Sequence, residues 1–176
     1  PVNGRLELIR TLPNEAKIFI DYAHTPDALE NVMTALVKQF NKKITLVFGC
    51  GGDRDKSKRK PMAKVANNFC DKIIVTDDNP RNEIPSKIRN EIFKYISSKS
   101  KFNIGRRNKA IEYSLIHSNY GEIILIAGKG HESIQDYGKK KYFTSDKKII
   151  KNTKIKFYNR ESQNIKNENS KLINSI

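Results

Sequence analysis

Residues 44–57 read ITLVFGCGGDRDKS, and this stretch decides how the rest of the chain is interpreted. Its first five residues form an apolar run rich in β-branched and aromatic side chains, which is typical of a strand buried on both faces of a parallel sheet. Gly49, Gly51 and Gly52 then allow backbone conformations that a side chain would forbid. Arg54 follows at the point where such a sheet opens onto its ligand crevice. Taken alone, the stretch is equally compatible with an ordinary strand-to-helix turn that carries solvated charges.

The segments on either side repeat this alternation of strands and helices. A helix is predicted after Thr25. Threonine is a favourable N-cap, Pro26 suits the first helical position, and apolar residues then recur every three or four positions. The pattern predicts an α/β fold, a Rossmann-like doubly wound and mainly parallel sheet with helices on both faces. Strands are predicted over residues 5–12, 16–20, 44–48, 72–76, 102–104 and 122–127, and helices over 26–40, 61–70, from 85 onward and over 109–117.

The length of 176 residues accommodates one domain with a tail. We expect the domain over residues 1–148 and a poorly ordered, basic, asparagine-rich tail over 149–176, because the apolar periodicity fades near Lys147. The chain does not begin with Met and has no apolar signal core, so we expect it to be a piece of a longer chain or an incomplete reading frame. No run approaches the roughly 18 apolar residues that span a bilayer, so no membrane partner is expected.

The formal charge of +15 raises the question of a nucleic-acid partner. Lysines are scattered along the chain and thicken after Asp146, but no arginine-rich helix, aromatic stacking signature or Cys/His finger accompanies them. The pattern therefore favours no nucleic acid; a basic nucleic-acid binder remains a weaker alternative, and it predicts binding that falls steeply with salt and survives the loss of Arg81. Two isolated cysteines, Cys50 and Cys70, suit a reducing, cytoplasmic location and predict neither a disulfide nor a metal site.

Four polar turns follow the ends of predicted parallel strands: DYAHTPD, GCGGDRDKS, DDNPRNE and GKGHES. Because the carboxyl ends of parallel strands gather at one edge of the sheet, the four turns are expected to form one crevice. Turn chemistry explains single Asp, Asn, Pro and Gly residues, but not four such turns at one edge. The polar side chains expected in this crevice are Asp21, His24, Arg54, Asp78, Asn79, Arg81, Lys129, His131 and Glu132.

The crevice residues indicate the chemistry of a ligand. Arginines in two of the turns suit a carboxylate or a phosphate, and the carboxylates of Asp78 and Glu132 suit an ammonium, so an amino-acid end satisfies both. The helix that starts at Pro26 offers its N-terminal amides to a phosphate beside His24. GGDRDKS is not a phosphate-binding P-loop, because Asp55 stands where that motif has glycine. No glycine fingerprint for dinucleotides is present, and the histidines lack the spacing of a metal site.

The motifs DYAHTPDALENV, GCGGDRDKSKR, TDDNPRNE and AGKGHE, in this order, resemble the C-terminal domain of MurE-type Mur ligases over about residues 1–148. The resemblance implies a Rossmann-like third domain in an ATP-dependent ligase of peptidoglycan synthesis. In that family ATP with Mg²⁺ phosphorylates the D-glutamate carboxylate of UDP-N-acetylmuramoyl-L-alanyl-D-glutamate, and the amine of meso-diaminopimelate attacks the acyl phosphate. The ATP and Mg²⁺ are held mainly by a central domain that this chain lacks.

The resemblance also assigns roles to individual residues. Arg81 would pair with the distal carboxylate of meso-diaminopimelate, which lysine lacks, so the sequence predicts diaminopimelate over lysine. No catalytic residue and no metal ligand are expected in this fragment. The amino-acid site is expected to comprise Arg54, Asp78, Asn79, Pro80, Arg81, Gly128 and Glu132, and the segment that faces ATP is expected to include Asp21 and His24.

Two departures from the family pattern stand out. The family usually has aspartate before the arginine of the segment that reads IGRRNKAI here, with Gly105 in that region, so a contact that the family makes there need not be present. The P-loop and modified lysine of the central domain and the uridine-nucleotide domain are absent, so the chain alone is expected neither to hydrolyse ATP nor to form the amide. A non-catalytic module that binds diaminopimelate or cell-wall fragments is the alternative, whereas GKGHE with DNPR argues against a folylpolyglutamate synthase relative.

Overall fold

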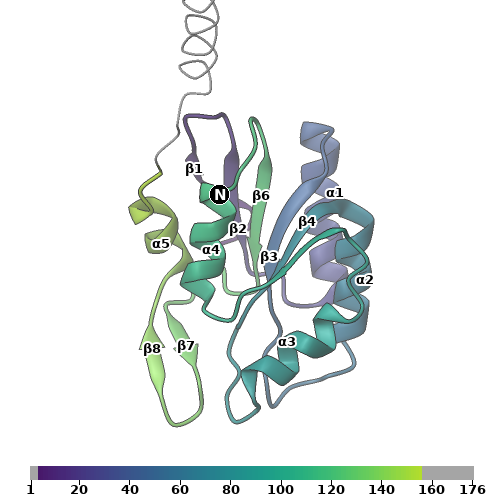
Figure 1. Cartoon of the computed structure of the whole chain (residues 1–176), viewed down its shortest axis with the longest axis vertical. Coiled ribbons are helices and arrows are strands. Elements are labelled where there is room, and N and C mark those ends of the chain that lie inside the picture. Colours follow the sequence, from purple (N-terminus) through teal and green to yellow (C-terminus); the bar gives the residue numbers. More distant parts are fainter. Residues whose placement is uncertain (1–3, 156–176) are drawn as a thin grey trace, which may run out of the picture.

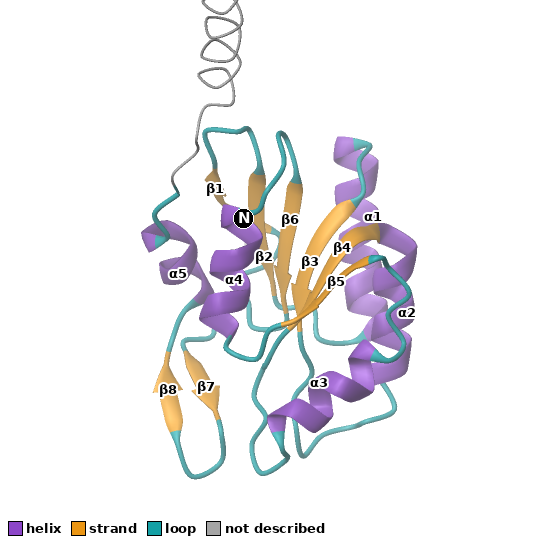
Figure 2. Cartoon of the chain, in the orientation of Figure 1, coloured by secondary structure: helices purple, strands orange, loops and turns teal. Residues whose placement is uncertain are grey.

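A six-stranded sheet lies between two layers of helices in the computed structural model, which describes residues 4–155 (Figures 1 and 2). The strand order is β1-β2-β6-β3-β4-β5, and every neighbouring pair is parallel except β1 with β2. The expected doubly wound, mainly parallel sheet is confirmed. Its strands are β1 (Glu7–Thr11), β2 (Lys17–Asp21), β3 (Ile44–Phe48), β4 (Cys70–Val75), β5 (Ser100–Asn103) and β6 (Ile123–Ala127).

The helices cover both faces of the sheet because successive residues of each buried strand point to opposite sides. Leu46 belongs to the core beneath α1, α2 and α3, and Val47 belongs to the core beneath α4 and α5. Figure 1 shows the first three helices on one side of the sheet and the other two across it. None of the helices in residues 4–155 is long and apolar enough to cross a membrane. The helices are α1 (Pro26–Phe40), α2 (Arg59–Phe69), α3 (Pro85–Phe93), α4 (Arg107–Ile116) and α5 (Asp146–Asn152).

Helix α1 shows how local sequence sets an element that positions the site. Thr25 adopts an extended conformation and its side chain accepts a hydrogen bond from the backbone amide of Ala28, so the helix begins at the expected residue. The helix ends where Asn41 enters the left-handed region with φ of 50° and its amide bonds to the Val37 carbonyl. The cap fixes the start of the helix beside the carboxyl end of β2.

A two-stranded hairpin, absent from the sequence-based expectation, follows the last strand of the sheet. It consists of β7 (Ile134–Asp136) and β8 (Lys141–Phe143), which pair antiparallel. Each strand has three residues, and all of β8 is exposed, so neither carries the apolar run that indicates a buried strand. Its one buried anchor is Gln135, whose amide nitrogen donates to the carbonyls of Asp77 and Asp78 at 3.2 and 2.8 Å.

The expected domain boundary at residue 148 falls inside α5, and this helix packs against the sheet. Ile150 is fully buried in the core on the α4 side of the sheet. The guanidinium of Arg10 donates to the carbonyls of Ile150 and Thr153, both at 2.8 Å, which ties the helix to β1. A helix of seven residues with a single fully buried apolar position shows no apolar periodicity, so no sequence pattern indicates it. The rest of the expected tail, from residue 156, lies outside the described residues.

Candidate functional site

The turns that follow β2, β3, β4 and β6 enclose a pocket of about 460 Å³ at the carboxyl edge of the sheet. Tyr22, Thr25, Asp55 and Lys58 lie in its wall together with residues that the sequence predicted. The topology therefore brings distant turns together at one edge, as expected for a wound parallel sheet. The predicted residues that line the pocket are His24, Arg54, Asp78, Asn79, Arg81, Gly128 and Glu132.

Asp21, expected in the segment that faces ATP, lies at the end of β2 and bonds to the backbone. Its side chain is buried, and its two carboxylate oxygens accept hydrogen bonds from the backbone amides of Ala23 at 2.7 Å and Leu6 at 2.6 Å. Its own carbonyl accepts from the amide of Gly128 at 3.0 Å. Asp21 therefore shapes the turn after β2, and the sequence could not separate this use of an aspartate from ligand binding.

Pro80 and His131, like Asp21, do not line the pocket. The carbonyl of Pro80 accepts a hydrogen bond from the amide of Glu83 at 3.1 Å, which closes the turn after β4. His131 is exposed, and its ring stacks on that of Tyr22 with 6.0 Å between centroids. Both residues support the turns rather than the cavity.

Two glycines allow the turns to approach each other closely. A Cβ at Gly52 would lie 1.9 Å from the carbonyl oxygen of Pro80, so no side chain fits there without moving the backbone. Gly128 has φ of 109°, and a Cβ there would lie 2.8 Å from a carboxylate oxygen of Asp78. The turns therefore lie closer together than a side chain at either position would allow.

Arg81 is held in an uncommon conformation at the pocket. Its φ is 52°, in the left-handed region that non-glycine residues rarely adopt. Its Nη1 donates to the carbonyl of Gly52 at 2.7 Å, and its backbone amide donates to the carbonyl of Asp136 at 3.0 Å. These bonds hold the guanidinium of Arg81 in the wall that Arg54 also lines.

Lys129 is a fully buried ammonium that does not line the pocket but contacts three residues that do. Its Nζ lies 3.0 Å from Asn79 Oδ1, 3.0 Å from Glu132 Oε2 and 3.9 Å from Asp78 Oδ1. Burial raises the pKa of Glu132, but the hydrogen bond and charge of Lys129 outweigh it, so this pKa lies below its ordinary value. Lys129 thus orients three predicted site residues and keeps Glu132 ionised.

A network missed by the sequence reading ties the turn after β3 to the turn after β4. Asp53 Oδ2 accepts from the side chain of Asn82 at 2.8 Å, and the backbone amide of Asp53 donates to Glu83 Oε1 at 2.8 Å. The buried guanidinium of Arg59 donates to the same Glu83 carboxylate at 2.9 and 3.1 Å and also to Glu91. In the sequence, Arg59 lies in the basic run KSKRK, where nothing separates a buried arginine from solvated neighbours.

The ionisation of Glu83 should make the stability of these turns depend on acid. Burial raises the pKa of Glu83, but hydrogen bonds from Arg59, the Asp53 amide and Lys56 lower it to about 2, from an ordinary value of 4.5. Because the pKa is depressed in the folded state, its stabilisation is present above pH 4.5 and is lost as the pH falls toward about 2. In urea unfolding, the difference in the free energy of unfolding between the wild type and Glu83→Gln should shrink as the pH falls across this range. A constant difference would contradict this role for the carboxylate.

No group of three or more His, Cys, Asp or Glu residues in residues 4–155 is arranged to hold a metal ion.

His24 is exposed at the start of α1, its Nδ1 lies 2.9 Å from the carbonyl of Tyr22, and its own carbonyl accepts from Lys58 at 2.9 Å. At Gly105 the backbone carbonyl accepts from the Asp77 amide at 3.1 Å, so the turn before α4 is joined to the site through the backbone.

Comparison with known protein families identifies the family to which the chain belongs. A model of the family described as Mur ligase, glutamate ligase domain, matches residues 4–130. The chain belongs to this family. A relative from Rickettsia typhi, named UDP-N-acetylmuramoyl-L-alanyl-D-glutamate--2,6-diaminopimelate ligase, is 45% identical over 153 residues, which are 86% of this chain and 30% of that protein. A relative of the same name from Wigglesworthia glossinidia brevipalpis is 45% identical over 151 residues, covering 84% and 30%.

The Mur ligase domain also matches solved structures. A structure titled as that of a UDP-N-acetylmuramoyl-L-alanyl-D-glutamate--2,6-diaminopimelate ligase superposes with a TM-score of 0.78 and 36% identity, over 85% of this chain and 31% of that chain. A folylpolyglutamate synthase from Mycobacterium tuberculosis superposes with a TM-score of 0.58 and 22% identity, over 73% and 30%, which supports the fold alone. The resemblance to MurE-type ligases of peptidoglycan synthesis is confirmed, and the Mur ligase domain spans about 30% of the length of those curated relatives.

Proposed function

We propose that this Mur ligase domain holds meso-diaminopimelate for an ATP-dependent ligase that adds it to UDP-N-acetylmuramoyl-L-alanyl-D-glutamate. The observation that carries the proposal is the pocket of about 460 Å³ that two guanidinium groups and three carboxylates line, those of Asp55, Asp78 and Glu132. Arg54 and Arg81 provide the bidentate donors that suit a carboxylate, and Asp78 and Glu132 accept from an ammonium. A zwitterionic amino-acid end has both complements.

The charges within the pocket set the orientation of this ligand. Glu132 has a lowered pKa beside the buried Lys129, so it stays a carboxylate at neutral pH. Asn79 accepts from Lys129 and from the backbone amide of Asp136 through its Oδ1, which leaves its amide nitrogen directed at Glu132, 3.4 Å away. The distal ammonium and carboxylate of diaminopimelate are bound here, which leaves the amine at the other end free to react. Gly128 lies in the wall beside the bound end, and Pro80 closes the turn that carries Arg81.

The phosphoryl donor belongs to the proposal as well. ATP supplies the phosphoryl group that activates the carboxylate of the nucleotide precursor, and Mg²⁺ accompanies it in a central domain outside this chain. The residues of this chain that face that side are His24, exposed at the start of α1, and the first amides of the helix. Asp21 supports this segment from below through its bonds to the backbone. On this proposal the chain alone binds the amino acid and forms no amide.

A domain exchange tests the proposal. Residues 1–155 of this chain would replace the corresponding domain of the Rickettsia typhi ligase, and ATP-dependent joining of meso-diaminopimelate to the nucleotide precursor would be followed by chromatography. We expect activity that requires Arg54 and Glu132, with Lys64→Ala, on the exposed side of α2, as the matched control. A folded chimera without ligation, combined with calorimetric binding of diaminopimelate to the 176-residue chain, would favour a non-catalytic binding module. Absence of both would overturn the proposal.

A further inference from the structure

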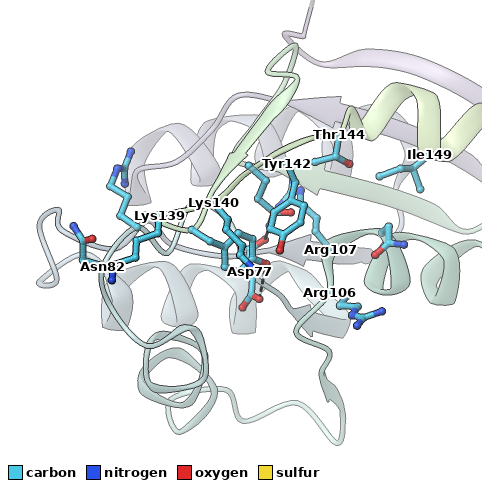
Figure 3. Close-up of a pocket in the computed structure, with 13 residues that line it drawn as sticks. Asp77, Asn82, Arg106, Arg107, Lys139, Lys140, Tyr142, Thr144 and Ile149 are labelled. Atoms are coloured by element: carbon cyan, nitrogen blue, oxygen red, sulfur yellow. Dashed lines mark hydrogen bonds between the residues drawn. The ribbon is translucent and has the colours of Figure 1, made fainter.

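A second and larger cavity, of about 970 Å³, lies behind the turn that follows β4. It is bounded by that turn, the β7–β8 hairpin and the starts of α4 and α5, and Figure 3 shows Tyr142, Arg107 and Asp77 gathered at its middle. Among the lining residues, only Arg81 also lines the pocket at the strand edge, and its guanidinium bonds to Gly52 on that other side. The two cavities are therefore separate sites.

The lining of this cavity is cationic. Arg106, Lys139 and Lys140 lie along it, and no ion pair is formed by any of the three within residues 4–155. The one carboxylate in the lining, Asp77, is already paired with Arg89 and accepts a hydrogen bond from the Tyr137 hydroxyl at 2.9 Å. An anion entering the cavity therefore meets unneutralised positive charge.

Two further groups of donors border the cavity and have no side-chain partner among the described residues. Arg107 is buried and bonds to Asp146 through Nε at 2.9 Å and Nη2 at 2.7 Å, but its Nη1 is buried with no hydrogen-bond partner among the described residues. Helix α4 begins at the same place, and its N-cap, Arg106, provides no side-chain hydrogen bond to the first amides. An uncapped helix N-terminus beside an unpartnered guanidinium nitrogen favours a bound anion with several oxygens.

The cavity also has an aromatic wall and more room than a simple anion needs. Tyr142 is 51% exposed, and its ring packs edge-on against that of Tyr137 with 5.5 Å between centroids. Its free surface can stack against a planar ring. A volume of about 970 Å³ is at the upper end of small-molecule sites and far exceeds inorganic phosphate. The occupant should therefore combine a phosphate with a flat heterocycle.

We propose that this cavity binds a nucleoside phosphate, with the phosphate against Arg106, Lys139, Lys140 and the start of α4, and the base against Tyr142. This site is distinct from the amino-acid pocket and does not depend on the proposed function. It uses residues of the hairpin and of α4 that the amino-acid site does not use.

Calorimetry of the 176-residue chain at low salt tests the proposal, with UMP, AMP, uridine and inorganic phosphate as the four probes. We expect one of the nucleotides to bind at a single site at least about tenfold more tightly than uridine or phosphate, because only it uses both the charges and the ring. Lys139→Ala/Lys140→Ala and Tyr142→Ala should each weaken that binding by about tenfold or more. These three side chains are exposed, and circular dichroism checks that the variants remain folded.

Two controls make the outcome decisive. Lys64→Ala/Lys87→Ala removes the same charge from exposed positions of α2 and α3, and should change nucleotide affinity by no more than about twofold. Arg54→Ala alters the amino-acid pocket alone and should also leave nucleotide affinity unchanged. The proposal is overturned if no nucleotide binds, if uridine or phosphate binds as tightly as the nucleotides, if the hairpin variants bind normally, or if Arg54→Ala abolishes binding.

Discussion

The Arg81→Ala variant should bind meso-diaminopimelate about 10 to 100 times more weakly than the wild type, because a hydrogen bond between charged groups contributes about 1.5–3 kcal/mol. Lysine has no distal carboxylate for Arg81 to bind. The wild type should therefore bind lysine more weakly than diaminopimelate, and Arg81→Ala should change the affinity for lysine little. In the wild type, lysine would leave the guanidinium of Arg81 without its ligand oxygens, which is the physical basis of the expected preference for diaminopimelate. Calorimetry of the chain with both amino acids measures the two effects.

The internal control is lysine itself, because it reports whether the pocket keeps its shape when the side chain of Arg81 is removed. The bond from Arg81 to the Gly52 carbonyl is lost in this variant, so a structural effect has to be separated from a recognition effect. Arg106→Ala removes an equal charge beside the other cavity and should leave diaminopimelate binding within about twofold. Equal losses for lysine and diaminopimelate in Arg81→Ala would show that Arg81 shapes the pocket and does not read the carboxylate.

The Asp146→Ala variant should lose about 3–5 kcal/mol of the free energy of unfolding, because it leaves a buried arginine without its partner. The Arg107 side chain is 0% exposed and the Asp146 side chain 1% exposed, and two hydrogen bonds join them. The remaining bond from Arg107, to the Ala127 carbonyl at 3.0 Å, does not neutralise the charge. Urea unfolding at neutral pH measures the loss.

A matched pair and a double variant sharpen this measurement. Asp71→Ala breaks the exposed pair with Lys43, whose atoms lie 3.9 Å apart, and should cost about 0–1 kcal/mol. The double variant Arg107→Met/Asp146→Ala removes both charges, and should recover much of the stability because buried ion pairs are often replaceable by apolar groups. A cost below about 1 kcal/mol for Asp146→Ala would contradict the inferred role of the pair.

The sheet was predictable from the sequence because burial on both faces leaves a distinctive pattern. Residues 44–48 and 123–127 are almost entirely apolar runs, and the alternation with helices predicts a parallel sheet and hence the edge where its turns meet. Residues such as Arg54 and Glu132 were located by that topological rule alone. The hairpin had no comparable signal, since its strands are short and mostly exposed and Gln135 is buried only by contact with the turn after β4.

Which charged residues are buried could not be predicted from the sequence. Arg59 and Arg107 are buried, yet in the sequence they stand beside exposed basic residues such as Lys60 and Arg106. Burial of a charge depends on a partner far along the chain, such as Asp146 for Arg107, and no local pattern announces that pairing. The same reason explains why Asp21 was expected among the crevice side chains although it does not line the pocket: an aspartate that binds backbone amides and one that binds a ligand have the same sequence context.

The strand order has a consequence for how the protein is made. β6 is the last strand of the sheet to be synthesised, but it lies between β2 and β3, which do not pair with each other. As the chain emerges from the ribosome, β1–β2 and β3–β4–β5 can form only as two separate sheets, each with an open, apolar edge. The nascent protein is therefore most exposed to aggregation and to chaperones until Ala127 is free to join them, whatever the stability of the finished fold.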